Sequence, residues 1–493
     1  MNTYLGFILV CLALTTLGQE DAEVKTCDSS DTEALTKSMN AFAIDLYKEI
    51  VKQNKGNDTE NVFISPISIS MALSMMLLGT AGDTKTQMVE TLHLKDTPGD
   101  IFHSAYACLK DFLFKDRKAF ALQSANKLYR DKTLKVKEPF LESLNKFYDG
   151  AIEELDFKDS ETSTKIINNW VAEQTMQMIK EVLVPGDIDT MTIMALVNAI
   201  YFKGSWVSQF KPENTKERIF HRLDKTTTPV TMMHQPEAFL HVSSPDLKAQ
   251  ILELPYVQEK KDKNAPKLCM DIILPNEKDG LRDTESRLTS ELFKEELYFL
   301  NAKPVYVDLP RLKLKSRYEI SSMLETLGMR DLFSSKVDLT PFSDDPRVDV
   351  SKVIHEAVVE MDEKGTEASA VTILTGGRSG ISSPVHFTCD HPFIFIIRDT
   401  TTNTILFMGR VTNPELRPNI QIDDEPLDLD EPNGDSKRDR RKECKMACRK
   451  KCRADCKESM ELEKGFKTDA ATFLEYKDCK RPCKETCFAA CRV

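Results

Sequence analysis

One stretch of the chain indicates the fold most directly: Glu363-Lys364-Gly365-Thr366-Glu367-Ala368-Ser369-Ala370-Val371-Thr372. It begins with charged residues and a glycine and continues with small or β-branched residues. Turn-forming residues follow at 375–380 and favour an exposed loop. Because Thr366, Ala368, Ser369 and Ala370 are small, the segment is able to enter a β-sheet as a strand without overpacking it. A flexible surface linker is the alternative interpretation.

The stretch lies between apolar segments that have the pattern of core strands. Residues 353–360 precede it, and residues 393–397 and 405–411 follow it around a turn at 401–403. Short apolar runs bounded by turn residues are typical of buried strands. A long loop between core strands, carrying one arginine at Arg378, is more often functional than a mere connection.

The length and composition indicate one large globular domain with an appendix. The chain has 493 residues, of which 41% are hydrophobic and 29% charged. The formal net charge of -11 argues against a nucleic-acid-binding protein. No internal repeat of the length that solenoids use is visible.

The N-terminus predicts secretion. Residues 5–14 form an apolar run too short to span a bilayer, and small or polar residues follow up to Gly18. We therefore expect a signal peptide at 1–18, and no other segment approaches the length of a membrane span. Asn57 heads the sequon Asn57-Asp58-Thr59, which predicts glycosylation.

The cysteines agree with a secreted protein. Without Cys11, an even number remains, and eight of these cysteines lie between Cys444 and Cys491. An even, clustered set in a secreted chain predicts disulfides. The sequence leaves the pairing of the body cysteines open: Cys27, Cys108, Cys269 and Cys389.

Helical and strand patterns alternate without a regular βαβ rhythm, which predicts an α+β fold with large, mostly antiparallel sheets. Helices are expected from Asp31 or Thr32 to Val51, from Ser65 to about Leu78, and in a short segment that ends at Gly328. The second of these is apolar nearly all round and should be buried. Strands are expected at 61–64, 193–202, 268–274 and 305–309.

From Leu35 to Pro414 the chain resembles a serpin. The motifs that carry the resemblance occur in the family's order, at 61–68, 79–84, 198–206, 254–256, 338–342, 363–372, 390–393 and 409–411. The resemblance implies an α+β serpin domain, here 19–418, with three β-sheets, about nine helices and an exposed reactive-centre loop.

The resemblance also implies a mechanism. In this family a target protease attacks the loop and forms an acyl-enzyme, and the cleaved loop then inserts into a sheet as a new strand. The implied hinge residues are Glu363, Gly365, Thr366, Ala368, Ser369 and Ala370. The cluster implied to control sheet opening is Ser65, Ser68, Asn198 and His355. We expect an inhibitor and not an enzyme, since no Gly-x-Ser-x-Gly elbow occurs, and we expect no cofactor or metal.

The reactive bond is predicted at Arg378–Ser379. Arg378 is the one basic residue of the loop after its hinge, and it suits the pocket of a trypsin-like protease with a carboxylate at its base. The commonest family spacing, counted from Glu363, instead places the bait at Ser379 and would favour an elastase-like target. A non-inhibitory serpin that serves as carrier or scaffold is the competing class, and its hinge should hold bulky, charged or proline residues.

An acidic and then basic linker is expected at 419–442, because Asp and Glu dominate 423–435 and Lys and Arg dominate 437–442. Cleavage after Arg441 by a furin-like convertase is one hypothesis, and a solvated basic face is the other. If the tail is released there, the body would serve mainly as its carrier.

The tail at 443–493 is predicted to be a helical hairpin. Its cysteines recur every four residues in two sets, which places each set on one helical face. Antiparallel helices would pair Cys444–Cys491, Cys448–Cys487, Cys452–Cys483 and Cys456–Cys479. Zinc binding is the rival interpretation. The Lys and Arg residues of the hairpin suggest attachment to a polyanion such as glycosaminoglycan or a microbial surface, or folding back onto the linker. We expect a monomer.

Overall fold

The computed structural model describes residues 29–54, 60–97, 101–115, 117–259, 262, 264–363 and 383–414. Several predicted features lie outside these residues: the signal peptide 1–18, Asn57, Gly365, Thr366, Ala368, Ser369, Ala370, Arg378, Ser379, the linker 419–442 and the eight tail cysteines from Cys444 to Cys491. The chain divides between Ile420 and Gln421 into two units, and the described residues all belong to the first.

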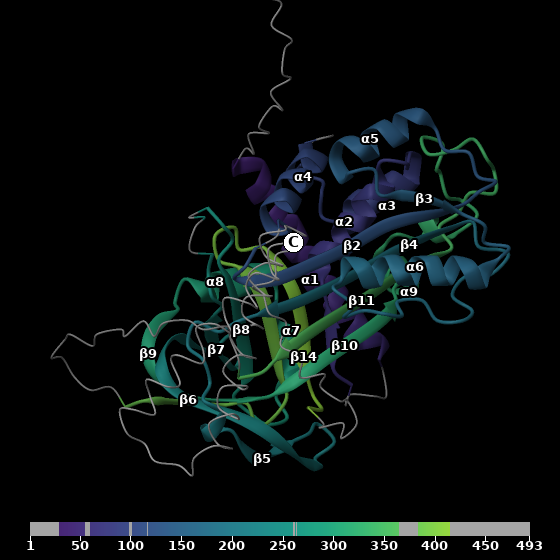
Figure 1. The fold of residues 1–493 in the computed structure, drawn as a ribbon. Coiled ribbons are helices and arrows are strands. Elements are labelled where there is room, and N and C mark those ends of the chain that lie inside the picture. The colour runs from purple at the N-terminus through teal and green to yellow at the C-terminus, as the bar shows by residue number, and fades with distance from the viewer. Residues whose placement is uncertain are drawn as a thin grey trace, which may run out of the picture. The chain divides into compact units, whose positions relative to one another are not determined.

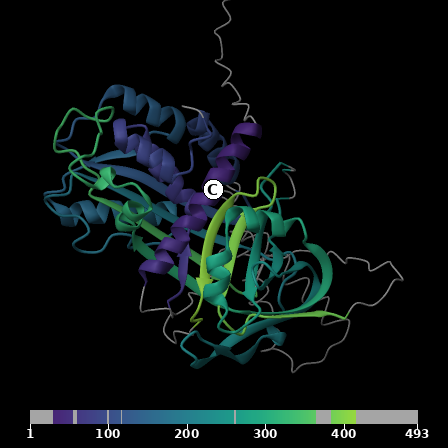
Figure 2. The same cartoon turned by 180° about the vertical axis from the view of Figure 1, so that it is seen from behind.

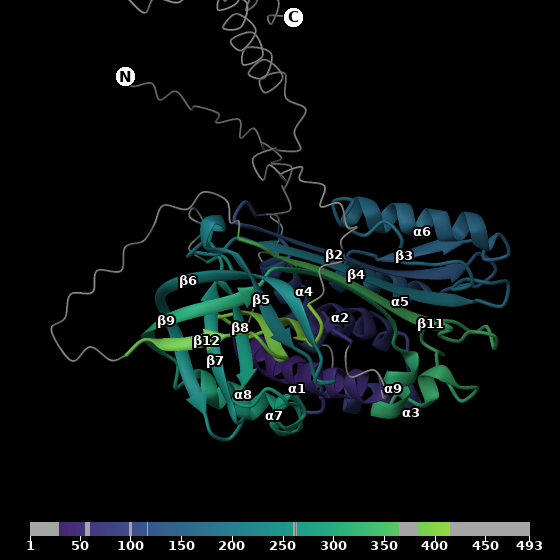
Figure 3. The ribbon, with the colours of Figure 1, turned by 90° about the horizontal axis from the view of Figure 1, so that it is seen from below.

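Five strands form the smaller sheet: β2 (Phe120–Asp131), β3 (Ile152–Leu155), β4 (Met194–Gly204), β10 (Leu312–Glu319) and β11 (Lys352–Met361). Their order is β10–β11–β4–β2–β3. Strands β4 and β11 are parallel neighbours, whereas β10 pairs antiparallel with β11 and β2 pairs antiparallel with β4. The helix α6 (Ser160–Gln174) lies on one face of this sheet and α2 (Pro66–Leu77) on the other (Figure 3).

Nine strands form the larger sheet: β1 (Val62–Ile64), β5 (Lys216–His221), β6 (Thr227–Ser244), β7 (Ala249–Pro255), β8 (Leu268–Pro275), β9 (Asn301–Pro310), β12 (Val385–Thr388), β13 (Phe393–Asp399) and β14 (Ile405–Val411). Their order is β1–β14–β13–β8–β7–β6–β9–β12, and β5 pairs with β6 (Figure 1). Every residue of β8, β13 and β14 is buried, which confirms the prediction of core strands around the turn at 401–403.

The sheets differ from the expectation in one respect. We expected three sheets, but the strands of the described residues form two hydrogen-bonded networks. The physical reason is the length of β6, which has 18 residues. Its residues 227–232 pair with β5, residues 232–241 with β9 and residues 240–244 with β7. One strand therefore joins what would otherwise be two sheets.

Within the described residues there are nine α-helices, which agrees with the expected number. The remaining ones are α1 (Ser29–Gln53), α3 (Gly82–Thr91), α4 (Ile101–Leu113), α5 (Glu138–Tyr148), α7 (Leu281–Arg287), α8 (Ser290–Leu297) and α9 (Ser321–Leu327). All 12 residues of α2 are buried, as its continuous apolar pattern predicts. The helix α1 lies alongside β14 (Figure 2). Gly328 ends α9 with φ of 135°, a backbone conformation that glycine adopts without strain.

Cys27 lies outside the described residues, and the other three body cysteines are of two kinds. Cys108 in α4 is disulfide-bonded, whereas Cys269 and Cys389 are free thiols. The prediction of disulfides was therefore wrong for the last two. Both are completely buried within the larger sheet region, where burial raises the pKa of each thiol well above its ordinary value. They pack as small apolar side chains instead of forming a cross-link. None of the helices in the described part of the chain is long and apolar enough to cross a membrane.

Candidate functional site

The site begins with the line between β4 and β11, which we call the seam. Residues Lys352 to Val359 of β11 pair in parallel with Ala195 to Phe202 of β4. The chain after β11 leads directly into the predicted hinge. A segment that reversed direction there would run antiparallel to β11, and therefore antiparallel to β4 as well. One additional strand inserted at the seam would therefore have an antiparallel partner on each side. It would replace the parallel pairing of β4 with β11, which is slightly less stable per residue than antiparallel pairing.

The four predicted cluster residues meet at the middle of the seam. His355 of β11 lies directly opposite Asn198 of β4 in the register, and its Nδ1 shares a hydrogen bond with Asn198 Oδ1. From the side of α2, the backbone N–H of Ser65 donates to His355 Nε2 at 3.1 Å. Asn198 Nδ2 donates to Ser68 Oγ at 2.5 Å. The network links the two seam strands to each other and to the N-terminal turn of α2.

These contacts determine the chemical state of His355. Because Nε2 accepts from the backbone N–H of Ser65, the ring proton lies on Nδ1, where it is donated to Asn198 Oδ1. The ring is fully buried, and burial lowers its pKa to about 3. His355 is therefore a neutral structural residue with both ring nitrogens paired, and it has no free nitrogen to act as a catalytic base.

Two residues of the network were missed in the sequence. Asn126 of β2 accepts hydrogen bonds from Asn198 Nδ2 and, at 3.1 Å, from Ser68 Oγ. Ser124 lies 3.1 Å from both Ser68 Oγ and Asn126 Nδ2. The available signal was their spacing of two residues, which puts these small polar side chains on the same strand face as the buried Leu122 and Leu128. We call Ser124 and Asn126, together with Ser65, Ser68, Asn198 and His355, the polar cluster.

The hinge end of β11 is contacted by side chains from the segment after β4 and by Arg311, which lies between β9 and β10. Of the predicted hinge residues, Glu363 is described, and its Oε1 accepts from Thr215 Oγ1 at 2.8 Å. Arg311 Nε lies 3.7 Å from Glu363 Oε2. The carbonyl of Asp362 accepts from Trp206 Nε1 at 3.0 Å. The end of β11, where the chain leaves the sheet, is therefore held through both the side chain of Glu363 and the backbone carbonyl of Asp362.

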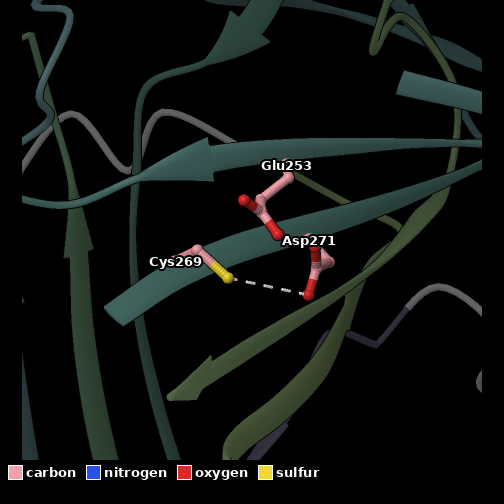
Figure 4. Close-up of side chains that lie close together, drawn as sticks. All are labelled: Glu253, Cys269 and Asp271. Carbon is pink, nitrogen blue, oxygen red and sulfur yellow. Dashed lines mark hydrogen bonds between the residues drawn. The ribbon is translucent and has the colours of Figure 1, made fainter. Parts of the chain in front are cut away.

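A separate group of three side chains has the composition of a metal site. In the described part of the chain, Glu253, Cys269 and Asp271 have ligand atoms within 4.8 Å of one another (Figure 4). Arg398 already supplies the cation: its Nε donates to Asp271 Oδ2 at 2.6 Å and its Nη2 to Glu253 Oε2 at 2.5 Å. Burial raises the pKa of both carboxyls despite the charge of Arg398. We interpret this group as a buried ion-pair network, because a metal would have to displace the guanidinium.

Lowering the pH from 7 to 5 is expected to destabilise the intact chain by about 2 kcal/mol through His355 alone. Its pKa is about 3 when folded and 6.5 in the reference state, so between these values the unfolded chain binds a proton that the native chain does not. The stabilisation is complete above pH 6.5 and is lost as the pH falls toward 3.

Urea unfolding at the two pH values checks this prediction on the unaltered chain and on a His355→Gln variant. The variant should show the smaller dependence on pH. His103, whose pKa burial and the charge of Lys85 lower to about 3, is present in both proteins and cancels in the comparison. The same loss in both proteins would contradict the assignment to His355.

Comparisons with known proteins are consistent with this geometry. Residues 37–414 match the family model described as Serpin (serine protease inhibitor). The leukocyte elastase inhibitor of Sus scrofa is 41% identical over 389 residues, which cover 78% of this chain and 100% of that protein. Uncleaved ovalbumin is similar in structure, with a TM-score of 0.69, 30% identity and coverage of 77% of this chain and 100% of ovalbumin. A thyroxine-binding globulin complex with thyroxine gives a TM-score of 0.68 and 29% identity over 77% of this chain and 99% of that one.

Proposed function

Because the chain belongs to the serpin family, we propose that it is a suicide inhibitor of trypsin-like serine proteases, with Arg378–Ser379 as its reactive bond. It is a protease inhibitor and not an enzyme. The serine of the target attacks the carbonyl carbon of Arg378, the amine of Ser379 leaves, and an ester joins the inhibitor to the protease. Insertion of the freed loop into the seam then carries the protease away before water hydrolyses that ester.

One observation carries the proposal: the hinge leaves β11 at a seam whose two parallel strands both lack an antiparallel neighbour on that side. A loop strand that entered there would gain ladder hydrogen bonds along both of its edges. The intact chain is then kinetically stable, because it is separated by a barrier from a lower state in which the sheet has one more strand. The small side chains of Thr366, Ala368, Ser369 and Ala370 suit rapid entry.

The bait residue has two candidates. Arg378 supplies a cation for a carboxylate at the base of a trypsin-like pocket. The spacing from Glu363 favours Ser379 instead, which would make Ser379–Gly380 the reactive bond. The name of the leukocyte elastase inhibitor, to which this chain is similar, supports an elastase-like target for that second candidate.

A carrier function is the competing class. The similar thyroxine-binding globulin was solved with thyroxine bound, so a chain with this fold is able to carry a small ligand. The hinge discriminates between the classes, since residues 366–370 contain neither proline nor a bulky apolar side chain, and the one charged residue, Glu367, is expected on the outward face. We therefore favour inhibition over transport.

Incubation with trypsin and with an elastase, followed by denaturing gels and mass analysis of the released C-terminal fragment, tests the proposal. A trypsin complex that survives denaturation, with a fragment beginning at Ser379, is the expected result. A fragment beginning at Gly380 would assign the bait to Ser379. Complete cleavage without any complex would leave the carrier function as the better explanation.

We further propose that the chain is secreted after removal of residues 1–18 and is glycosylated at Asn57, which the apolar N-terminal run and the sequon support. The tail is proposed to be a disulfide-linked hairpin that binds a polyanion through its Lys and Arg residues. Heparin chromatography of the full chain and of a chain ending at Ile420 tests this. Elution of both at the same salt concentration would count against polyanion binding.

A further inference from the structure

One carboxylate, on the face of the smaller sheet opposite to that of His355, is shared between two strands. Glu360 of β11 contacts Lys203 of β4 with 3.2 Å between Nζ and Oε2. It contacts Lys313 of β10 with 2.5 Å between Nζ and Oε1. Each carboxylate oxygen therefore faces a different lysine, one from each neighbouring strand.

The two contacts differ in what they join. Lys313 lies directly opposite Glu360 in the antiparallel β10–β11 pair, whereas Lys203 follows Phe202, the last residue of β4 that pairs with β11. Only the Lys203 contact crosses the seam. Another ion pair on this face, Lys315 with Glu356 at 2.9 Å, also joins β10 to β11. Among the ion pairs of the described residues, Lys203–Glu360 is the one that ties β4 to β11.

Glu360 is ionised under ordinary conditions. Burial raises its pKa, but the hydrogen bond from Lys313 and the charge of Lys203 outweigh burial and hold that pKa below its ordinary value. The side chains are only partly exposed, at 30% for Lys203 and 19% for Glu360, so the contact is less screened than a fully exposed pair.

We propose that Lys203 is a positioning residue for strand insertion, since its ion pair with Glu360 holds the hinge end of the seam closed and has to break before a strand enters. This inference rests on the proposed function, because it names a residue that sets the rate of insertion. Neighbouring strands lie about 4.8 Å apart, and an inserted strand doubles the separation of β4 and β11. Lys203 would then have to reach over the new strand, whereas Lys313 keeps its place beside Glu360.

The consequences are kinetic and depend on salt. Removal of a partly exposed ion pair is expected to accelerate opening about threefold. Because salt screens such pairs, raising the ionic strength should accelerate insertion in the unaltered chain and have little effect once Lys203 is gone.

The experiment compares Lys203→Gln with Lys313→Gln in the full-length chain. Both variants remove one lysine from the same carboxylate, but only the first removes a contact across the seam. The probe is a synthetic peptide with the sequence of residues 365–378, and its uptake is followed over time on native gels and by mass, without any protease. Lys203→Gln should take up the peptide about threefold faster than the unaltered chain, and Lys313→Gln at the unaltered rate.

A Glu360→Gln variant provides a second measurement. It should accelerate uptake as Lys203→Gln does, and adding Lys203→Gln to it should give no further increase. Equal uptake rates in Lys203→Gln and Lys313→Gln would overturn the inference and leave the inhibitory function untouched. Failure of all chains to take up the peptide would overturn both. Normal peptide uptake without any covalent protease complex would count against the proposed function alone.

Discussion

An Arg378→Ala variant is expected to inhibit trypsin about a thousandfold more slowly than the unaltered chain. The physical reason is the loss of one buried charge pair in the first encounter, since the guanidinium of Arg378 is proposed to pair with the carboxylate at the base of the protease pocket. Removing one partner of such a pair leaves the other charge buried and unpaired, which costs several kcal/mol. The second-order rate constant of trypsin inhibition measures the effect.

Ser379→Ala is the matched control for this prediction. It changes the residue on the other side of the same bond and preserves the cation, so its rate constant for trypsin should stay within a few-fold of that of the unaltered chain. Inhibition of trypsin that survives Arg378→Ala, together with loss of elastase inhibition in a Ser379→Asp variant, would assign the bait to Ser379 and contradict the proposal.

A Thr366→Arg variant is expected to be cleaved at the reactive bond but to trap almost no protease. Glu367 is expected on the outward face of the inserted strand, so its neighbour Thr366 should point toward the protein interior. An arginine there would have to bury a charge without a partner, at a cost of several kcal/mol. Entry of the loop would slow by about a hundredfold or more, and water would hydrolyse the ester first. The ratio of inhibitor consumed to protease inhibited measures this change.

The neighbouring position supplies the control. Glu367 is expected on the alternate, outward face of the inserted strand, so Glu367→Arg should keep most of the inhibition. Trapping of protease by both variants to the same extent would mean that residues 366 and 367 do not alternate between the interior and the surface, and that the loop does not enter the sheet as a strand.

Much of the fold followed from local patterns. The continuous apolar pattern of α2 predicted its burial, and the runs around the turn at 401–403 predicted the core strands β13 and β14. The gathering of Ser65, Ser68, Asn198 and His355 followed from the family resemblance, because no local pattern brings residues 290 positions apart into contact. The set of family motifs, taken together, therefore predicted that these distant residues meet.

Other features depend on register, which a single sequence does not reveal. Ser124 and Asn126 join the polar cluster because β2 pairs with β4 so that Asn126 lies opposite Asn198. The same holds for Glu360, whose two lysines come from strands far apart in the sequence. The merging of two expected sheets into one required knowledge of how far β6 extends. The even number of cysteines led to a wrong prediction of disulfides for Cys269 and Cys389. A count of cysteines does not distinguish a buried free thiol from a disulfide-bonded one.

The most direct measurement compares thermal unfolding of the intact chain with that of the chain cleaved within residues 375–380 by a protease that it does not trap. If the seam between β4 and β11 accepts the cut loop, the cleaved protein should unfold at a clearly higher temperature, because the added strand has antiparallel partners on both sides. Unfolding of the cleaved protein at or below the temperature of the intact one would show that the native chain stores no free energy for insertion, and would contradict inhibition by this mechanism.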